Sequence, residues 1–164
     1  MIEFLKASTG THFKLIEDLA STIWNKHYIP IIGKAQVAYM LDKFQSKSVI
    51  ADQVSSGYHY YILKNNLDNV GYICIKEEND SLFLSKLYVL KYFRGKGFGK
   101  QAMSFIETKA KELKCKSISL TVNKNNSHSI KAYEKLGFKN LGEIVIDIGN
   151  GFVMDDYRMS KIIK

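Results

Sequence analysis

The 164-residue sequence has very little proline and cysteine. Pro30 is the only proline, and Cys74 and Cys115 are the only cysteines. Neither cysteine belongs to a CxxC pair, so we expect neither a disulfide scaffold nor a metal site, and we predict two buried, unreactive thiols. No segment is dominated by Gly, Ser or charge, and no internal repeat is present. We therefore predict one domain spanning residues 1–164.

The sequence also lacks long hydrophobic runs. It contains no apolar stretch of 18 residues, and its start "MIEFLKASTG" has neither the basic beginning nor the apolar core of a secretory signal. We expect a cytoplasmic protein without a membrane partner.

Negative charge is scarce relative to positive charge. The sequence has 24 Lys or Arg and 16 Asp or Glu, a net charge of +8, and residues 91–116 hold eight Lys or Arg against two carboxylates. A basic field of this kind favours an anionic partner, which could be nucleic acid, an acidic surface or a phosphorylated cofactor. A lysine-rich solvated face would explain the lysines near the end of this range, but not the glycines near its start.

Hydrophobic periodicity predicts the element order βααβββαβαββ. Short polar turns between the central strands imply antiparallel pairing, and one strand–helix–strand segment implies a right-handed parallel crossover. We predict an α/β (mixed α+β) fold, in which helices cover both faces of a mixed, mostly antiparallel sheet. The predicted strands are residues 2–7, 58–64, 70–76, 82–89, 117–122 and two strands flanking 149–151. The predicted helices are one that follows Thr9 or Thr11, one around 37–44, and those at 97–113 and 127–136.

Three glycines alternate with other residues in "KYFRGKGFGKQAM", residues 91–103, directly before a predicted helix. They are Gly95, Gly97 and Gly99. Glycine is favoured where φ must be positive or where a ligand approaches the main chain. Four interpretations compete: a phosphate-binding loop, a dinucleotide fingerprint, an RNA-binding strand and a solvated turn.

Three of these interpretations fail on residue spacing. A Walker-type loop needs glycine where Arg94 stands and Ser or Thr where Gln101 stands. The dinucleotide fingerprint needs its third glycine at the position of Lys100. "KGFG", residues 96–99, matches the start of an RNA-binding strand motif, but the match ends at Lys100, and Phe98 belongs to a helical apolar face. A simple turn would need only one glycine.

What remains is an anion site at the start of a helix. Such an end exposes about four unpaired N–H groups and a partial charge of about +0.5, which together bind phosphate. Arg94, Lys96 and Lys100 surround this end. We therefore predict that the amides of residues 95–100 hold a phosphate or pyrophosphate.

The stretch "LYVLKYFRGKGFGKQAM", residues 87–103, resembles the acyl-CoA-binding motif of the GNAT superfamily of N-acetyltransferases. That motif has Arg or Gln, two residues, Gly, one residue, and then Gly or Ala. Arg94, Gly97 and Gly99 occupy these positions.

A second block, "VNKNNSHSIKAYEKLGF" at residues 122–138, is similar to the later motif of the same family. Asn126 precedes Tyr133 by the expected seven residues, ahead of "EKLGF". The element order also fits the GNAT fold, so the resemblance covers nearly the whole chain. The first helical region and the ending "GNGFVMDDYRM" show a weaker similarity to bacterial polyamine acetyltransferases.

The resemblance implies acetyl-CoA as co-substrate and no metal. The pyrophosphate would lie on the amides of residues 95–100, and the pantetheine arm would pair like an extra strand with residues 87–89. The strands before and after the glycine helix would splay apart to hold the thioester. The residues implied in cofactor binding are Leu87, Tyr88, Val89, Arg94, Gly95, Lys96, Gly97, Phe98, Gly99, Lys100, Asn126 and Tyr133.

The chemistry assigns roles to two of these residues. By its family position, the backbone N–H of Val89 would stabilise the oxyanion. Tyr133 is the predicted general acid for the leaving thiolate, because a phenol with a pKa near 10 is a suitable proton donor to it. A core role for Tyr133 is the alternative. Asn126 either contacts a ligand or only caps the helix that starts at Ser127.

Amine deprotonation has no obvious base in this sequence. An alkylammonium with a pKa near 10.4 is neutral about once in 2,500 molecules at pH 7, so its proton must be removed. Many relatives carry Glu on the strand before the glycines, where this chain has Ser85 and Lys86. The proton could leave through ordered water, or to Glu77, His27 or Asp155.

We therefore predict an acyltransferase that moves an acetyl group from acetyl-CoA to a primary amine of a small molecule, with a polyamine as the first guess. The alternatives are a protein or peptide amine as acceptor, and a non-catalytic acyl-CoA sensor. Nucleic acid is not expected as a partner, and the hairpin around Asn150 and Gly151 could form a homodimer edge. The carboxylates that could bind a polyamine are Glu77, Glu78, Asp80, Asp147, Asp155 and Asp156.

Overall fold

The computed structural model describes residues 1–164 and contains one seven-stranded sheet. The strand order is β1-β2-β3-β4-β5-β7-β6, and every neighbouring pair is antiparallel except β4 and β5. The predicted mixed, mostly antiparallel sheet is thus confirmed. The strands are β1 (Glu3–Lys6), β2 (Tyr58–Asn65), β3 (Asp68–Glu78), β4 (Ser81–Val89), β5 (Ser117–Asn123), β6 (Lys139–Gly149) and β7 (Phe152–Ile162).

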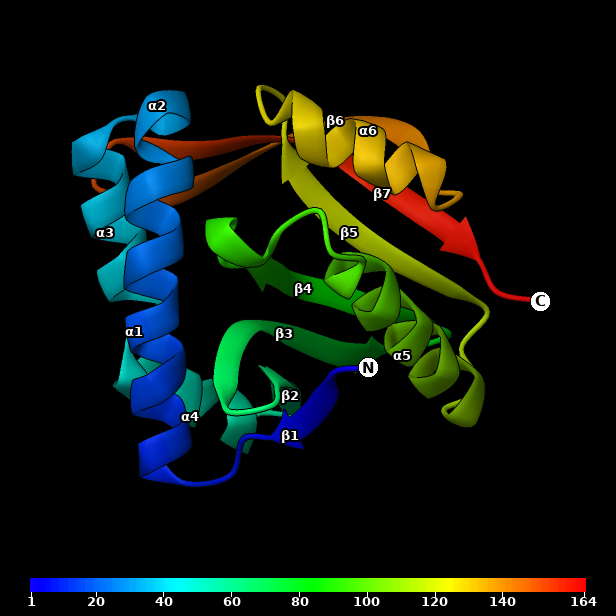
Figure 1. Ribbon diagram of the computed structural model, residues 1–164. Coiled ribbons are helices and arrows are strands. Elements are labelled where there is room, and N and C mark those ends of the chain that lie inside the picture. Colours follow the sequence, from blue (N-terminus) through cyan, green and yellow to red (C-terminus); the bar gives the residue numbers. More distant parts are fainter.

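Helices cover both faces of the sheet, as predicted. Helices α1 to α4 lie on one face, and α5 and α6 lie on the other (Figure 1). Two short helices, α2 and α4, and a 3-10 turn at Lys91–Phe93 were absent from the predicted order. No helix is both long and apolar enough to span a membrane. The helices are α1 (Gly10–His27), α2 (Ile29–Ile32), α3 (Lys34–Phe44), α4 (Lys47–Ser55), α5 (Phe98–Glu112) and α6 (Ser127–Lys135).

Local signals explain where these helices begin and end. Of the two capping candidates, Thr9 is the N-cap of α1, and its hydroxyl accepts a hydrogen bond from the amide of His12. Gly137 has a φ of 98° directly after α6, and the amide of Phe138 donates to the carbonyl of Tyr133. This is the glycine-terminated helix end that the sequence predicts.

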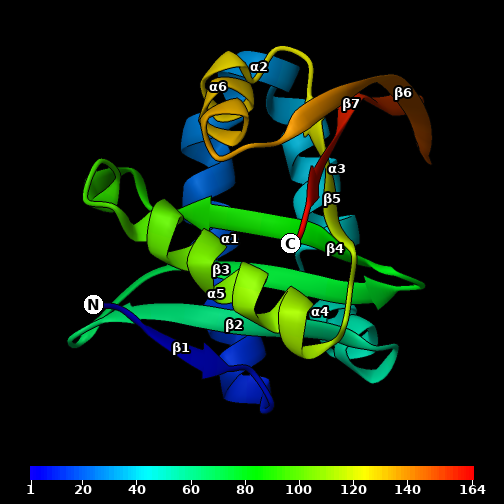
Figure 2. The ribbon, with the colours of Figure 1, turned by 90° about the vertical axis from the view of Figure 1, so that its right-hand side faces the viewer.

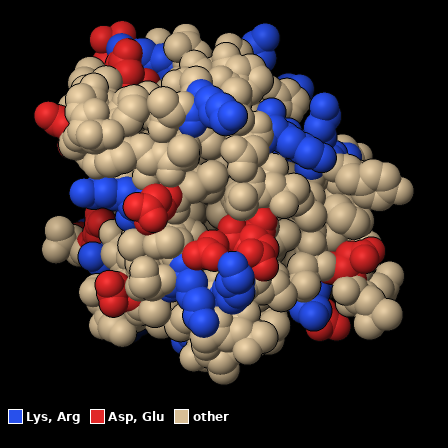
Figure 3. All heavy atoms as spheres, turned by 90° about the vertical axis from the view of Figure 1, so that its left-hand side faces the viewer, with Lys and Arg blue, Asp and Glu red and all other residues tan.

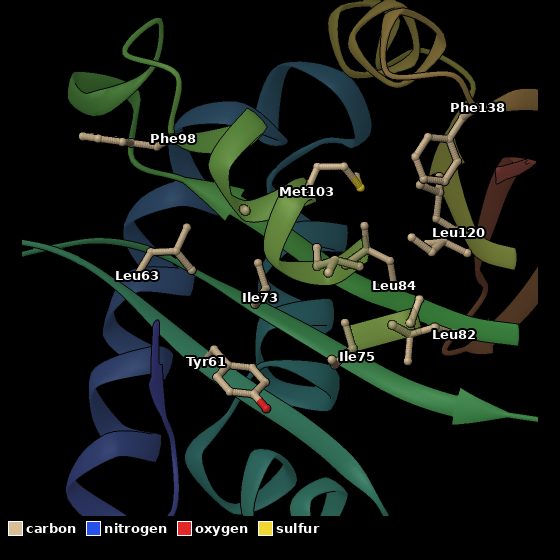
Figure 4. Packing of buried hydrophobic residues seen from close by; sticks show 14 of the residues in the cluster. Tyr61, Leu63, Ile73, Ile75, Leu82, Leu84, Phe98, Met103, Leu120 and Phe138 are labelled. Atoms are coloured by element: carbon tan, nitrogen blue, oxygen red, sulfur yellow. The ribbon is translucent and has the colours of Figure 1, made fainter. Parts of the chain in front are cut away.

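The sheet separates two hydrophobic cores. Figure 4 shows the core beneath α5, in which Phe98 and Met103 of the helix lie over side chains from the sheet. Phe98 is only 8% exposed, which agrees with its predicted place on the apolar helix face. The other core joins α1, α3 and α4 to the opposite face and includes the buried tyrosines Tyr60 and Tyr72. Both cysteines are buried and unpaired, as expected.

The only parallel pair of strands is joined over a short distance. Strands β4 and β5 are paired at three positions, from Ser81 opposite Ser117 to Phe83 opposite Ser119. Beyond that point β4 continues to Val89 and β5 to Asn123 without pairing to each other, and the two strands diverge (Figure 1). The predicted splay is therefore present, and the crossover helix α5 lies across the sheet beside it (Figure 2).

A β-bulge changes which face of the sheet β4 presents. Ile75 pairs with Leu84 and Cys74 pairs with Lys86, so Ser85 is the extra residue. Before the bulge, the even-numbered Leu84 packs into the α5 core. After the bulge, Lys86 contacts groups on the α1–α4 side of the sheet.

The final hairpin reaches over helix α3. The Tyr39 hydroxyl donates to the carbonyl of Ile148 at 2.6 Å, and the Gln36 side-chain amide donates to the carbonyl of Val153 at 2.9 Å. Strand β6 forms a free edge of the sheet. The homodimer along this hairpin stays a prediction.

Candidate functional site

A cavity of about 180 Å³ opens where β4 and β5 diverge. Its walls come from both strands, from α1, α2 and α3 on one side, from α6 and Arg94 on another, and from β7. Segments far apart in the sequence therefore meet at one hollow. We call the part near Arg94 and α6 the cofactor end, and the part near α1 to α3 and β7 the acceptor end.

The predicted anion site at the start of α5 has the required free amides. The first hydrogen bond of the helix runs from the amide of Gln101 to the carbonyl of Gly97, and none of the amides of residues 95–100 donates to a protein acceptor. Gly95 and Gly97 have φ angles of 77° and 82°, which L side chains rarely adopt. A Cβ atom at Gly95, Gly97 or Gly99 would meet no atom within 4 Å, so the space beside these Cα atoms is open.

The end of β4 presents main-chain groups to the gap. The amide of Leu90 donates to the carbonyl of Val70 at 2.8 Å, and antiparallel pairing alternates, so Leu87 and Val89 direct their amides away from β3. Because β5 is not paired there, these amides face the cavity. Arg94 Nε donates to the carbonyl of Val89 at 3.0 Å, so this predicted cofactor residue also holds the end of the strand.

The two residues of the later motif lie at the cavity, Asn126 at the N-cap of α6 and Tyr133 within the helix. Tyr133 lines the cavity and packs edge-on against Phe138, with ring centroids 5.6 Å apart. Burial raises the pKa of Tyr133 above its usual value, and Tyr28 adds to the rise. The phenol is therefore protonated at neutral pH, as a general acid must be.

Asn126 does not cap α6 with its side chain. The side chain is 3% exposed and instead connects to α1. Asn126 Oδ1 lies 3.2 Å from Nε2 of His27, and Nδ2 donates to the hydroxyl of Tyr28 at 3.4 Å. Asn126 thus occupies the N-cap position of α6 without a side-chain capping bond, and its side chain joins the later motif to His27 of α1 and to Tyr28.

Aromatic rings dominate the acceptor end. Trp24 stacks on Tyr28 with ring centroids 4.3 Å apart, and Tyr88 lies edge-on to Trp24 at 5.7 Å. Ile32, Met40 and Met154 also line the cavity. This end is mostly apolar, so it suits an acceptor with a hydrocarbon body better than a strongly hydrated acceptor.

Asp156 is the only carboxylate among the cavity-lining residues, and it is 4% exposed. Burial raises its pKa to about 6, the neighbouring Asp155 adds to the rise, and Thr121 opposes it. At pH 7 and above this carboxylate is therefore ionised, with a basicity suited to proton transfer near neutrality.

Of the three bases named from the sequence, only His27 lines the cavity. Burial lowers its pKa, and nearby Arg94 and His128 lower it further. Glu77 is exposed on β3, and Asp155 pairs with Lys124 at 2.8 Å outside the cavity. Sequence reasoning placed Asp156 only among six carboxylates and did not name it as a base.

Lys86 is a second group whose place the sequence does not reveal. It is 6% exposed, and its Nζ donates to the carbonyl of Phe44 at 2.8 Å and to the hydroxyl of Tyr60. Burial lowers the pKa of Lys86 to about 8, and Cys74 opposes this shift only in part. No carboxylate forms a salt bridge with this lysine.

Comparison with known proteins identifies the family. The model of the acetyltransferase (GNAT) family matches residues 22–138, which include the glycine stretch and the second motif. The chain belongs to this family, which confirms the resemblance on which the site residues were predicted. No group of three or more metal-ligating side chains lies close enough together to hold an ion.

Individual relatives agree with this assignment. The chain is 35% identical over 68 residues to a probable spermine N(1)-acetyltransferase of Bacillus subtilis subsp. natto, which covers 41% of this chain and 45% of that protein. It is 30% identical over 129 residues to the N-acetyltransferase YycN of Bacillus subtilis, covering 72% and 83%. This chain thus matches less than half the length of the spermine enzyme.

Solved structures share the fold. The PaiA N-acetyltransferase of Thermoplasma acidophilum, in complex with coenzyme A, superposes with a TM-score of 0.81 over 99% of both chains, at 21% identity. At this identity the likeness establishes the fold alone.

Proposed function

We propose that this protein transfers an acetyl group from acetyl-CoA to a primary amine of a small molecule, by direct attack within a ternary complex. The observation that carries the proposal is that two halves lie side by side: six free amides of residues 95–100 at the start of α5, just beyond Arg94 at the edge of the cavity, and a cavity that contains a buried carboxylate on β7. The first half suits a pyrophosphate and the second half suits an amine.

The cofactor would be held mainly by main-chain groups. The amides of residues 95–100 would bind the pyrophosphate, with Lys96 and Lys100 beside it, and the free edge of β4 at Leu87 and Val89 would pair with the pantetheine arm. Bound acetyl-CoA would supply the thioester carbonyl that the amine attacks. The N–H of Val89 would donate to the carbonyl oxygen as it gains negative charge.

The amine must lose a proton before it attacks. Transfer from an alkylammonium of ordinary pKa to the Asp156 carboxylate, whose pKa in the folded protein is about 6, would cost about 6 kcal/mol. Burial of the ammonium group lowers its pKa and reduces this gap, so Asp156 would accept the proton. The nitrogen–carbon bond then forms, the carbon–sulfur bond breaks, and Tyr133 donates its proton to the departing sulfur. The nitrogen, which still carries one proton more than the neutral amide, gives that proton up and so restores the phenol of Tyr133.

A coupled assay tests the reaction. The purified protein, acetyl-CoA and a panel of primary amines should release free CoA thiol and give an N-acetylated amine of matching amount by mass spectrometry. Acetyl-CoA binding without turnover of any amine would instead favour the non-catalytic sensor. Absence of acetyl-CoA binding would remove both functions.

The finer identity of the acceptor remains a proposal. A polyamine is supported by the partial similarity to spermine acetyltransferases. A protein or peptide amine is the alternative acceptor, and small amines and short peptides belong in the same panel. A cytoplasmic location is likewise a prediction.

A further inference from the structure

We propose, resting on the function above, that the acceptor carries a single positive charge and an apolar body, such as an alkyl or arylalkyl primary amine, and that the acceptor end selects against a second ammonium group. The basis is the lone carboxylate Asp156 facing an apolar, aromatic wall.

The charges around the cavity favour only one cation. Of the six carboxylates that could have bound a polyamine, Asp156 alone lines the cavity. The other charged or titratable cavity residues besides the tyrosines are cationic or basic: His27, Lys86, Arg94 and His128. A second ammonium would therefore enter without a carboxylate partner, at the cost of its hydration.

Two other carboxylates of the final hairpin already have partners within the protein. Asp155 pairs with Lys124, and Asp147 Oδ1 accepts the amide of Gly149 at 2.8 Å. On the face of the molecule that carries α1 and α3, acidic and basic side chains are interspersed (Figure 3). A long polycation thus finds little to hold its remaining charges.

The cavity wall next to Asp156 is lined by apolar side chains, which suit a hydrocarbon group. Met154 lies two residues before Asp156 on β7, on the same face of the strand, and Ile32 and Met40 lie across from it on α2 and α3. One face of Trp24 and one face of Tyr28 are stacked on each other at 4.3 Å, so these two faces are not open to a cation. An alkyl or phenyl group would gain burial here, whereas an ammonium would lose solvation.

A matched pair of amines tests the inference. Hexylamine and 1,5-diaminopentane have the same chain length and differ only in a terminal methyl or ammonium group. At pH 8 we expect kcat/KM to be at least about tenfold higher for hexylamine, and 2-phenylethylamine should exceed spermidine by a similar factor.

A binding measurement keeps this test separate from catalysis. Trp24 is the only tryptophan and lines the cavity, so its fluorescence should report amine binding to the CoA-loaded protein. Tighter binding of hexylamine without turnover would support the inference and overturn the proposed function. Equal or better binding and turnover of 1,5-diaminopentane, spermidine or only a peptide amine would overturn the inference and leave acetyl transfer standing.

A substitution should shift the preference of the acceptor end from hexylamine toward 1,5-diaminopentane. Met154→Glu adds a carboxylate beside Asp156 and should shift the ratio of the two kcat/KM values at least tenfold toward the diamine, whereas Met154→Gln should not. Ile32→Glu places the charge on the opposite wall and serves if β7 does not tolerate the change. An unchanged ratio in the folded Glu variants would count against the inference.

Discussion

The two ends of the cavity are built in different ways. The cofactor end, near Arg94 and α6, lies beside the free edge of β4 and beside one continuous stretch of free main-chain amides, residues 95–100, just outside the cavity. The acceptor end consists of side chains from α1, α2, α3, β4 and β7. Any sequence with the right glycines can form the first, whereas the second depends on how distant elements pack. The cofactor can thus stay constant while the acceptor changes.

Tyr133 lies on α6 at the cofactor end, and removal of its hydroxyl alone, with the ring kept, should have the largest effect on turnover. Tyr133→Phe is expected to lower kcat by about 10²–10³-fold, because the leaving sulfur loses its proton donor. KM for acetyl-CoA and for the amine should each stay within about threefold. The measurement is steady-state kinetics, with Tyr157→Phe as a control outside the cavity. A wild-type kcat would assign Tyr133 to packing alone.

Asp156→Asn should damage the acceptor end alone. We expect kcat/KM for the amine to fall by about 10²-fold, with acetyl-CoA affinity unchanged. In the wild type, kcat/KM should decrease as pH falls through about 6, where this carboxylate becomes protonated. Asp156→Asn should not show this decrease in its pH profile, whereas His27→Gln should still show it.

The same substitution separates function from stability. The pKa of Asp156 is higher in the folded protein than the ordinary 3.8, so the wild type loses stability as pH rises from about 4 to about 6. Asp156→Asn should therefore be more stable at pH 7, by roughly 1–2 kcal/mol in urea unfolding. The neighbouring Asp155→Asn, which lies outside the cavity, is the matched control. A destabilised Asp156→Asn would mean that the carboxylate is needed for the fold.

Gly97→Ala should damage the cofactor end alone. Its φ of 82° is costly for alanine, and the shift needed to relieve the strain would misplace the amides of α5. We expect acetyl-CoA to bind about tenfold more weakly by calorimetry. Gly57→Ala carries similar strain at a φ of 98° away from the cavity, and should reduce stability without changing the affinity. Equal affinities in both variants would contradict an anion site at this helix.

Lys86→Met should have the smallest effect. The pKa of Lys86 is about 8 in the folded protein, below the ordinary 10.5, so the stability of the wild type should rise by about 1 kcal/mol or more between pH 8 and pH 10.5. The variant should lose this rise, measured by urea unfolding across that range, whereas Lys111→Met on exposed α5 surface should keep it. An unchanged pH profile in Lys86→Met would show that the lysine is fully solvated.

The free amides at the start of α5 could be predicted from sequence because they are encoded locally, whereas their role in binding the cofactor stays a prediction. Glycines at fixed spacing before an amphipathic helix suffice to place free amides, and Gly95, Gly97 and Gly99 lie where the pattern put them. The strands were also found from local patterns. The short helix α4 was missed, because nine residues give only a weak periodic signal beside the polar "SSG".

The acceptor end could not be predicted because the sequence does not show which of two adjacent residues of the same type points into the cavity. Asp155 and Asp156 differ only in the face of β7 to which they point, and that depends on the register with β5 and β6. One signal was available in β4. Its apolar residues shift from even positions at Leu82 and Leu84 to odd positions at Leu87 and Val89, which is the mark of the bulge at Ser85.

The three-position pairing of β4 with β5 has a mechanical consequence. Strands β1 to β4 and strands β5 to β7 form two parts of the sheet, and the only strand pairing between these parts is the short seam at these three positions. A molecule bound where β4 and β5 diverge would contact both parts and restrict their motion relative to each other. Amide hydrogen exchange along the seam, at residues 82–84 and 118–120, should therefore slow when acetyl-CoA binds, although these amides lie at the far end of the divergence from the glycines.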